Sequence, residues 1–145
     1  MRNTFIFSLI VTIIFSSFDI KKEAMIFFQK DGVTALDTHK WYLTTIYKTN
    51  GYTQVLIRKA FISFNTTDGR ISGNGSCNSF GGKLTVDSSG ISFGNIFSTK
   101  MYCNDVQSIE NDFFSRLSKV TRYEIRGNKL LLFEGDELVL EFEAG

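Results

Sequence analysis

The segment TRYEIRGNKLLLFEGDELVLEFE, residues 121–143, decides the fold class of this chain, because it predicts three consecutive antiparallel strands. Gly127-Asn128 and Gly135-Asp136 interrupt its apolar runs, and such pairs are typical of tight hairpin turns. In the last strand, three apolar residues alternate with mostly acidic ones: Leu138, Leu140 and Phe142 against Glu137, Val139, Glu141 and Glu143. This alternation predicts a strand with one face on a hydrophobic core.

A helix is predicted immediately upstream of these strands. Five apolar residues recur at intervals of three or four, which lines one face of an α-helix: Val106, Ile109, Phe113, Leu117 and Val120. Asn104 is expected to cap the helix, with Gln107 completing a capping box. The charged residues are expected to lie largely off the apolar face: Glu110, Asp112, Arg116 and Lys119. The helix dipole accounts for acids near the start and bases near the end.

The chain upstream of the helix is predicted to form short strands separated by turns. Strands are expected over residues 41–47, 60–65, 82–87 and 90–94, with turn residues such as Asn-Gly and Asp-Ser-Ser-Gly between them. The order of strands, one helix and more strands predicts an α+β fold. In its simplest form this is a curled antiparallel β-sheet or half-barrel with one main α-helix packed against it.

The first 24 residues have the features of a secretory signal peptide. Arg2 precedes an apolar run over residues 5–15, which is short for a membrane span of about 18 residues or more. We therefore predict a signal peptide over residues 1–24, an N-terminal extension over 25–35 and one domain over 36–145. No A-x-A-like triplet marks a cleavage site, so an uncleaved membrane anchor is one alternative, and a buried first helix is another. Membrane contact is expected only if the segment stays uncleaved.

The charge balance and size of the remaining chain limit its partners. Without residues 1–24 the chain has 13 basic and 13 acidic residues, so a nucleic-acid partner is not expected. About 120 residues can bury a real core, and fifteen phenylalanines supply bulky side chains for it. We expect a monomeric domain.

The chain has two cysteines, Cys77 and Cys103. In an exported protein a single pair is interpreted first as a disulfide, and a loop of about 26 residues would gain about 3–4 kcal/mol of stability. Two buried thiols are one alternative. A metal site is another, but His39 and the cysteines lack the close spacing usual for zinc ligands. Because the first cysteine is Cys77, a lipid anchor on a cysteine after the signal peptide is not expected.

The sequence contains no catalytic or cofactor-binding motif. His39 follows Asp37, but no G-x-S-x-G elbow accompanies them. The glycine-rich segment 73–82 lacks the lysine of a phosphate-binding loop and leads into a strand rather than a helix. We therefore assign no catalytic, cofactor-binding or metal-binding residue and expect no cofactor.

The segments around the two cysteines resemble the META domain family, which includes the heat-shock protein HslJ. The resemblance extends over about residues 36–143 and is most specific at 77–80 and 98–103. The matching motif positions are Trp41, Asn78, Phe80, Ser98, Thr99 and Met101. The chain departs from the family at three positions, where glycine, an aromatic residue and alanine are common: Ser76, Leu84 and Tyr102.

The resemblance implies an antiparallel sheet with a helix, in a small envelope or secreted protein associated with stress. The family member HslJ is associated with resistance to the antibiotic novobiocin. The family is also similar to a lipid-binding type III secretion pilotin. No catalytic residues are established for the family. We therefore expect an exported, non-enzymatic protein of the bacterial periplasm or envelope that binds an apolar ligand or a protein partner. The alternatives are an envelope hydrolase with acidic residues in the concave face of the sheet, and an inhibitor or interaction module that uses residues 74–80 as a rigid loop.

Overall fold

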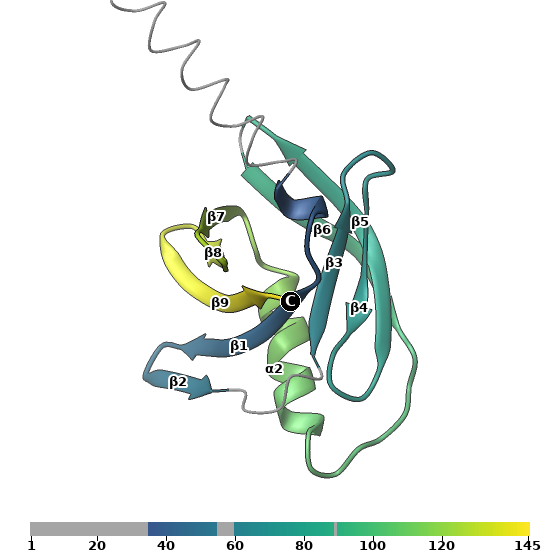
Figure 1. Ribbon diagram of the computed structural model, residues 1–145. Helices are drawn as coiled ribbons and strands as arrows, with labels where there is room; N and C mark the ends of the chain where they lie inside the picture. The colour runs from purple at the N-terminus through teal and green to yellow at the C-terminus, as the bar shows by residue number, and fades with distance from the viewer. Residues whose placement is uncertain (1–34, 55–59, 89) are drawn as a thin grey trace, which may run out of the picture.

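The predicted α+β architecture is confirmed by a computed structural model, which describes residues 35–54, 60–88 and 90–145. The predicted signal peptide and all but the last residue of the predicted extension lie outside these described residues. Figure 1 shows a strongly curled sheet with the helix α2 lying between its two halves. The helix comprises Gln107–Leu117.

One antiparallel sheet contains all nine described strands. They are β1 (Trp41–Lys48), β2 (Gly51–Gln54), β3 (Phe61–Asn65), β4 (Arg70–Asn74), β5 (Ser79–Asp87), β6 (Gly90–Ser98), β7 (Arg122–Arg126), β8 (Lys129–Glu134) and β9 (Glu137–Ala144). Their order across the sheet is β6-β5-β4-β3-β1-β9-β8-β7, and β2 pairs with β1. The two ends of the sheet meet where the Ile91 N–H donates to the Thr121 carbonyl, 3.1 Å away.

The strands predicted upstream of the helix are present as β1, β3, β5 and β6, whereas β2 and β4 were not predicted. In β3, Ile62 and Phe64 are buried and face the core. The β5–β6 hairpin is longer than predicted, since its strands begin at Ser79 and end at Ser98. Gly127, between β7 and β8, has a φ of 61°, a left-handed conformation that residues with side chains rarely adopt.

The predicted outward orientation of Val139 in β9 is wrong. Leu132 pairs with Leu140 whereas Phe133 pairs with Leu138, so Val139 is an extra residue at a β-bulge. Val139 and Leu140 are consequently both buried. Beyond the bulge the alternation resumes, with Phe142 buried between partly exposed neighbours.

The core lies between α2 and the concave side of the sheet. Phe113 is fully buried, and its ring centroid lies 5.6 Å from that of Phe80 in β5 and 6.2 Å from that of Phe142 in β9. One helical side chain therefore joins both halves of the sheet. Burying such a side chain contributes about 1.5–3 kcal/mol.

The predicted cap at Asn104 is also wrong. The helix begins after Val106, and no side chain caps it. The Cys103 carbonyl accepts hydrogen bonds from the N–H groups of Val106 and Gln107, so a backbone turn leads into the helix. The Gln107 side chain accepts a long hydrogen bond from the Cys103 N–H, at 3.4 Å, rather than reaching Asn104. Among the described residues, no helix has the length and apolar character needed to cross a membrane.

Candidate functional site

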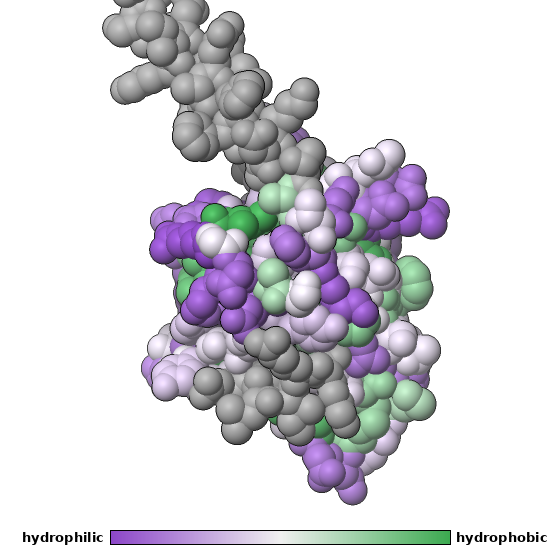
Figure 2. Space-filling view, in the orientation of Figure 1, coloured by the Kyte–Doolittle hydropathy of each residue, from purple (hydrophilic) through white to green (hydrophobic). Residues whose placement is uncertain are grey.

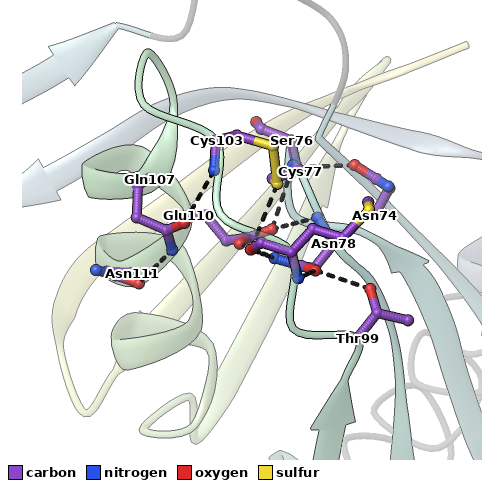
Figure 3. Close-up of a disulfide and its surroundings, with 10 residues drawn as sticks. Asn74, Ser76, Cys77, Asn78, Thr99, Cys103, Gln107, Glu110 and Asn111 are labelled. Atoms are coloured by element: carbon purple, nitrogen blue, oxygen red, sulfur yellow. Dashed lines mark hydrogen bonds between the residues drawn. A yellow bond between two sulfur atoms is a disulfide. The ribbon is translucent and has the colours of Figure 1, made fainter.

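The predicted pairing of Cys77 with Cys103 is present as a disulfide. Cys77 lies in the connection between β4 and β5, and Cys103 lies between β6 and α2, with 6.0 Å between their Cα atoms. The bond therefore joins two connections that lie beside the helix start (Figure 3). It fixes the end of the 98–103 segment, which carries half of the family motif.

Glu110 is a buried carboxylate beside this disulfide. It projects from α2 toward the β4–β5 connection (Figure 3), and only 2% of its surface is exposed. Its Oε1 accepts hydrogen bonds from the backbone N–H groups of Cys77 and Asn78, at 3.2 and 2.6 Å. Its Oε2 accepts one from Asn78 Nδ2 at 2.6 Å. None of the described cationic side chains forms a salt bridge with Glu110, so these N–H donors compensate for its burial.

Asn78 connects this carboxylate to the 98–103 segment. Its Nδ2 donates to the Met101 carbonyl at 3.0 Å in addition to Glu110. Its Oδ1 accepts from the Met101 N–H at 2.7 Å and from the Thr99 hydroxyl at 2.8 Å. Both amide donors and both acceptor positions of the side chain are thus used. Asn78 is only 3% exposed, and it links the β4–β5 connection, α2 and the 98–103 segment.

The bend before Cys77 leaves no room for a side chain at Gly75. A Cβ at Gly75 would lie 2.7 Å from Glu110 Oε1 and 2.9 Å from Phe114 Cζ. Ser76 follows with a φ of 101°, a conformation that favours glycine. Asn74 Oδ1 accepts a hydrogen bond from the Ser76 N–H at 2.9 Å and stabilises the bend. Glycine is common at position 76 in the family that the sequence resembles, so this departure places serine in a strained conformation.

The motif positions of the sequence fall into two groups. Trp41 and Phe80 belong to the core: the Trp41 indole N–H donates to the Leu36 carbonyl at 3.0 Å, and Phe80 packs on α2. Asn78, Thr99 and Met101 form the network beside the disulfide. Ser98 pairs with Phe80 at the end of β6 and leads into that network.

The network places two large apolar side chains at the surface. Met101 is 60% exposed and Tyr102 is 77% exposed, although the backbone of Met101 is bonded on both sides to Asn78. Beside them is a hollow of about 500 Å³, bounded on the helix side by Gln107, Asn111 and Phe114. We refer to Met101, Tyr102 and this hollow as the Met101–Tyr102 surface. Its backbone is held at Met101 by Asn78 and anchored at Cys103 by the disulfide, and its side chains are open to solvent.

Glu110 is the functional residue that sequence reasoning missed, because its charge suggested a solvent-facing position. The prediction that it lies off the apolar face is wrong, since it points inward beside Phe113 and Leu117. The spacing of Glu110 in the sequence indicates that it shares the apolar face, because it follows Val106 by four residues and precedes Phe113 by three.

A second polar cluster lies on the outer side of the sheet. Glu141 in β9 accepts hydrogen bonds from the Tyr47 hydroxyl at 2.8 Å and from Lys129 Nζ at 2.6 Å. The hydrogen bond from Lys129 lowers the pKa of Glu141, and burial together with the Glu141 hydrogen bond raises the pKa of Tyr47 to about 12. These three groups join β1, β8 and β9 and hold one another in fixed charge states near neutral pH.

Comparisons with known proteins agree with this architecture. The family model of the META domain matches residues 34–144. No curated protein matches the chain. An NMR structure of a protein from Burkholderia xenovorans is similar with a TM-score of 0.64 and 21% identity, covering 77% of this chain and 85% of that one. A crystal structure of a DUF4847 family protein from Bacteroides vulgatus ATCC 8482 has a TM-score of 0.62 and 20% identity, covering 79% of this chain and 98% of that one. At these identities the likeness concerns the fold alone.

Proposed function

The chain belongs to the META domain family, and from this premise we propose that it is an exported, non-catalytic binding protein of the bacterial envelope. Its binding site is the Met101–Tyr102 surface, and its ligand is a protein partner with apolar side chains that enter the adjacent hollow. The rigid display of two exposed apolar side chains on a bonded backbone carries this proposal.

Rigid support favours recognition, because a segment that is already ordered loses little conformational entropy on binding. Methionine and tyrosine are enriched at the centres of protein interfaces. The polar groups of Lys100, Gln107 and Asn111 border the hollow and would form the rim of such an interface. The concave side of the sheet is packed with α2 and core side chains, so a surface contact has more support than an apolar ligand held inside the sheet.

Site-specific photo-crosslinking in living cells tests the partner. A crosslinking amino acid replaces Tyr102 in one strain and Tyr52 in another, since Tyr52 is 70% exposed but lies on β2, away from the site. We expect a defined adduct from position 102 that disappears when Met101 is changed to Ser, and no such adduct from position 52. Equal adducts from both positions, or none from position 102, would contradict the proposal.

Export is tested by the intact mass of the protein recovered from the exported fraction. A mass that lacks the N-terminal segment, with alkylation of two thiols only after reduction, supports export with the Cys77–Cys103 bond formed. Retention of residues 1–24 would indicate an anchored protein, and recovery in the cytoplasm alone would contradict export.

We further propose that the same surface serves in stress tolerance, a role that the family resemblance implies. In a strain that lacks the protein, we expect the original sequence and the Tyr52→Ser variant to restore growth under heat or novobiocin. The Tyr102→Ser variant should not restore it, although it should be present in equal amount. If both variants restored growth equally, the Met101–Tyr102 surface would not be needed for stress tolerance.

A further inference from the structure

A groove lined by both polar and apolar residues crosses the outer face of β3, β4, β5 and β6. Its volume is about 910 Å³. Figure 2 shows hydrophilic side chains gathered near the turn that joins β3 to β4, where one end of the groove lies. Phe97 of β6 also lines the groove. The proposed protein-binding function does not use this groove.

Two cations lie side by side along one side of the groove. Arg70 in β4 and Lys83 in β5 are directly opposite in the strand register, and both are exposed. Neither forms a salt bridge with any residue that the structure describes. Asp68 also lines the groove, where its carboxylate accepts a hydrogen bond from the neutral Asn65 amide at 2.9 Å, so the two cations and this carboxylate leave a net charge of about +1. Like charges directly opposite on neighbouring strands are destabilising, and an anion between them would relieve that repulsion.

The floor of the groove is a row of small residues that ends at an aromatic ring. Ser63, Ser72, Gly81 and Phe97 follow one another across the four strands. A Cβ at Gly81 would lie 2.8 Å from Phe97 Cζ, so the ring rests against the glycine backbone. The ring is nevertheless 69% exposed. The floor thus offers hydroxyl groups and one flat apolar surface.

These groups define the chemistry of the ligand. The backbone N–H and C=O groups of β4 and β5 are used by the strand pairing on both sides, so an extended peptide would find no backbone partners on the floor. The groups that remain are hydroxyls, side-chain amides at Asn65 and Asn95, two cations, the Asp68 carboxylate and a ring face. The negative face of an aromatic ring attracts C–H groups. We propose that the groove binds an acidic oligosaccharide, with a sugar ring on Phe97 and a carboxylate between Arg70 and Lys83.

Calorimetric titration of the purified protein tests this site, with an oligomer of galacturonic acid as the probe. A neutral maltose oligomer of equal length, oligoglutamate and inorganic phosphate are titrated in parallel. We expect the acidic sugar to bind at least about 10-fold more tightly than the other three. Equal binding of the neutral sugar would overturn the role of the cations. Tighter binding of oligoglutamate or phosphate, or the absence of sugar binding, would overturn the proposed ligand class.

Variants of the groove separate its parts. The Arg70→Ser, Lys83→Ser double variant should weaken binding of the acidic sugar about 10-fold, because two exposed ion pairs are lost. Lys119→Ser, an exposed cation beyond the end of α2, should leave affinity unchanged. Phe97→Ser should weaken binding without changing its salt dependence.

Thermal unfolding of each variant verifies the fold, and unchanged sugar binding by Tyr102→Ser distinguishes this site from the Met101–Tyr102 surface. The proposal would be overturned if the Arg70→Ser, Lys83→Ser double variant bound the acidic sugar as tightly as the Lys119→Ser control.

Discussion

Glu110 and Asn78 hold each other at two points: one carboxylate oxygen accepts the backbone N–H of Asn78 at 2.6 Å, and the other accepts its side-chain amide at 2.6 Å. Because the remaining amide groups of Asn78 bind Met101 and Thr99, a single helical carboxylate positions the surface segment indirectly. This relationship determines what changes at the site should do.

Replacing Glu110 by Gln should lower the free energy of unfolding by about 2–3 kcal/mol. The glutamine amide would keep one acceptor for the backbone N–H groups, but its NH₂ would face the Nδ2 donor of Asn78. Denaturant unfolding measures the change. Asp112→Asn on the same helix is the control, since its exposed salt bridge with Lys48 should contribute less than about 1 kcal/mol. Equal effects of the two changes would show that the Glu110 network contributes no special stability.

Removing the disulfide should lower the free energy of unfolding by about 3–4 kcal/mol, as expected for a closed loop of this length. The Cys77→Ser, Cys103→Ser double variant, or the reduced protein, is compared with the oxidised protein by urea unfolding. We also expect faster hydrogen exchange at the Met101 N–H, which Asn78 protects. Unchanged exchange there would mean that Asn78 alone holds the segment.

Replacing Ser76 by Gly should raise the free energy of unfolding by about 1 kcal/mol. The φ of 101° at Ser76 strains a residue with a side chain, and glycine adopts it freely. The matched control is Ser92→Gly in β6, an exposed strand position where glycine should destabilise by about 0.5–1 kcal/mol. The two changes should therefore shift the melting temperature in opposite directions. A shift of the same sign would contradict the assigned strain.

The strands and the helix could be predicted because their patterns are local. The strand over 60–65 and the turn at Gly127 depend on neighbouring residues alone, and both were found. The bulge at Val139 could not be predicted, because it arises from the register between two strands. The motif resemblance located Asn78 and Thr99, but the role of Asn78 depends on Glu110, 32 residues further along the chain, and that of Thr99 depends on Asn78, 21 residues earlier. The groove depends on which four strands become neighbours, which no local pattern specifies.

Replacing Glu141 by Gln should destabilise the protein at neutral pH by at most about 1 kcal/mol, and the difference should vanish in acid. The hydrogen bond from Lys129 lowers the pKa of Glu141 in the folded state. A lowered carboxyl pKa contributes stability that is present above the unfolded value, about 4.3, and is lost as the pH falls through the folded value. Urea unfolding at several pH values from 7 downward measures this. Glu137→Gln, at the exposed start of the same strand, is the matched control variant. A difference that persists unchanged below the folded pKa would assign the effect to packing rather than to charge.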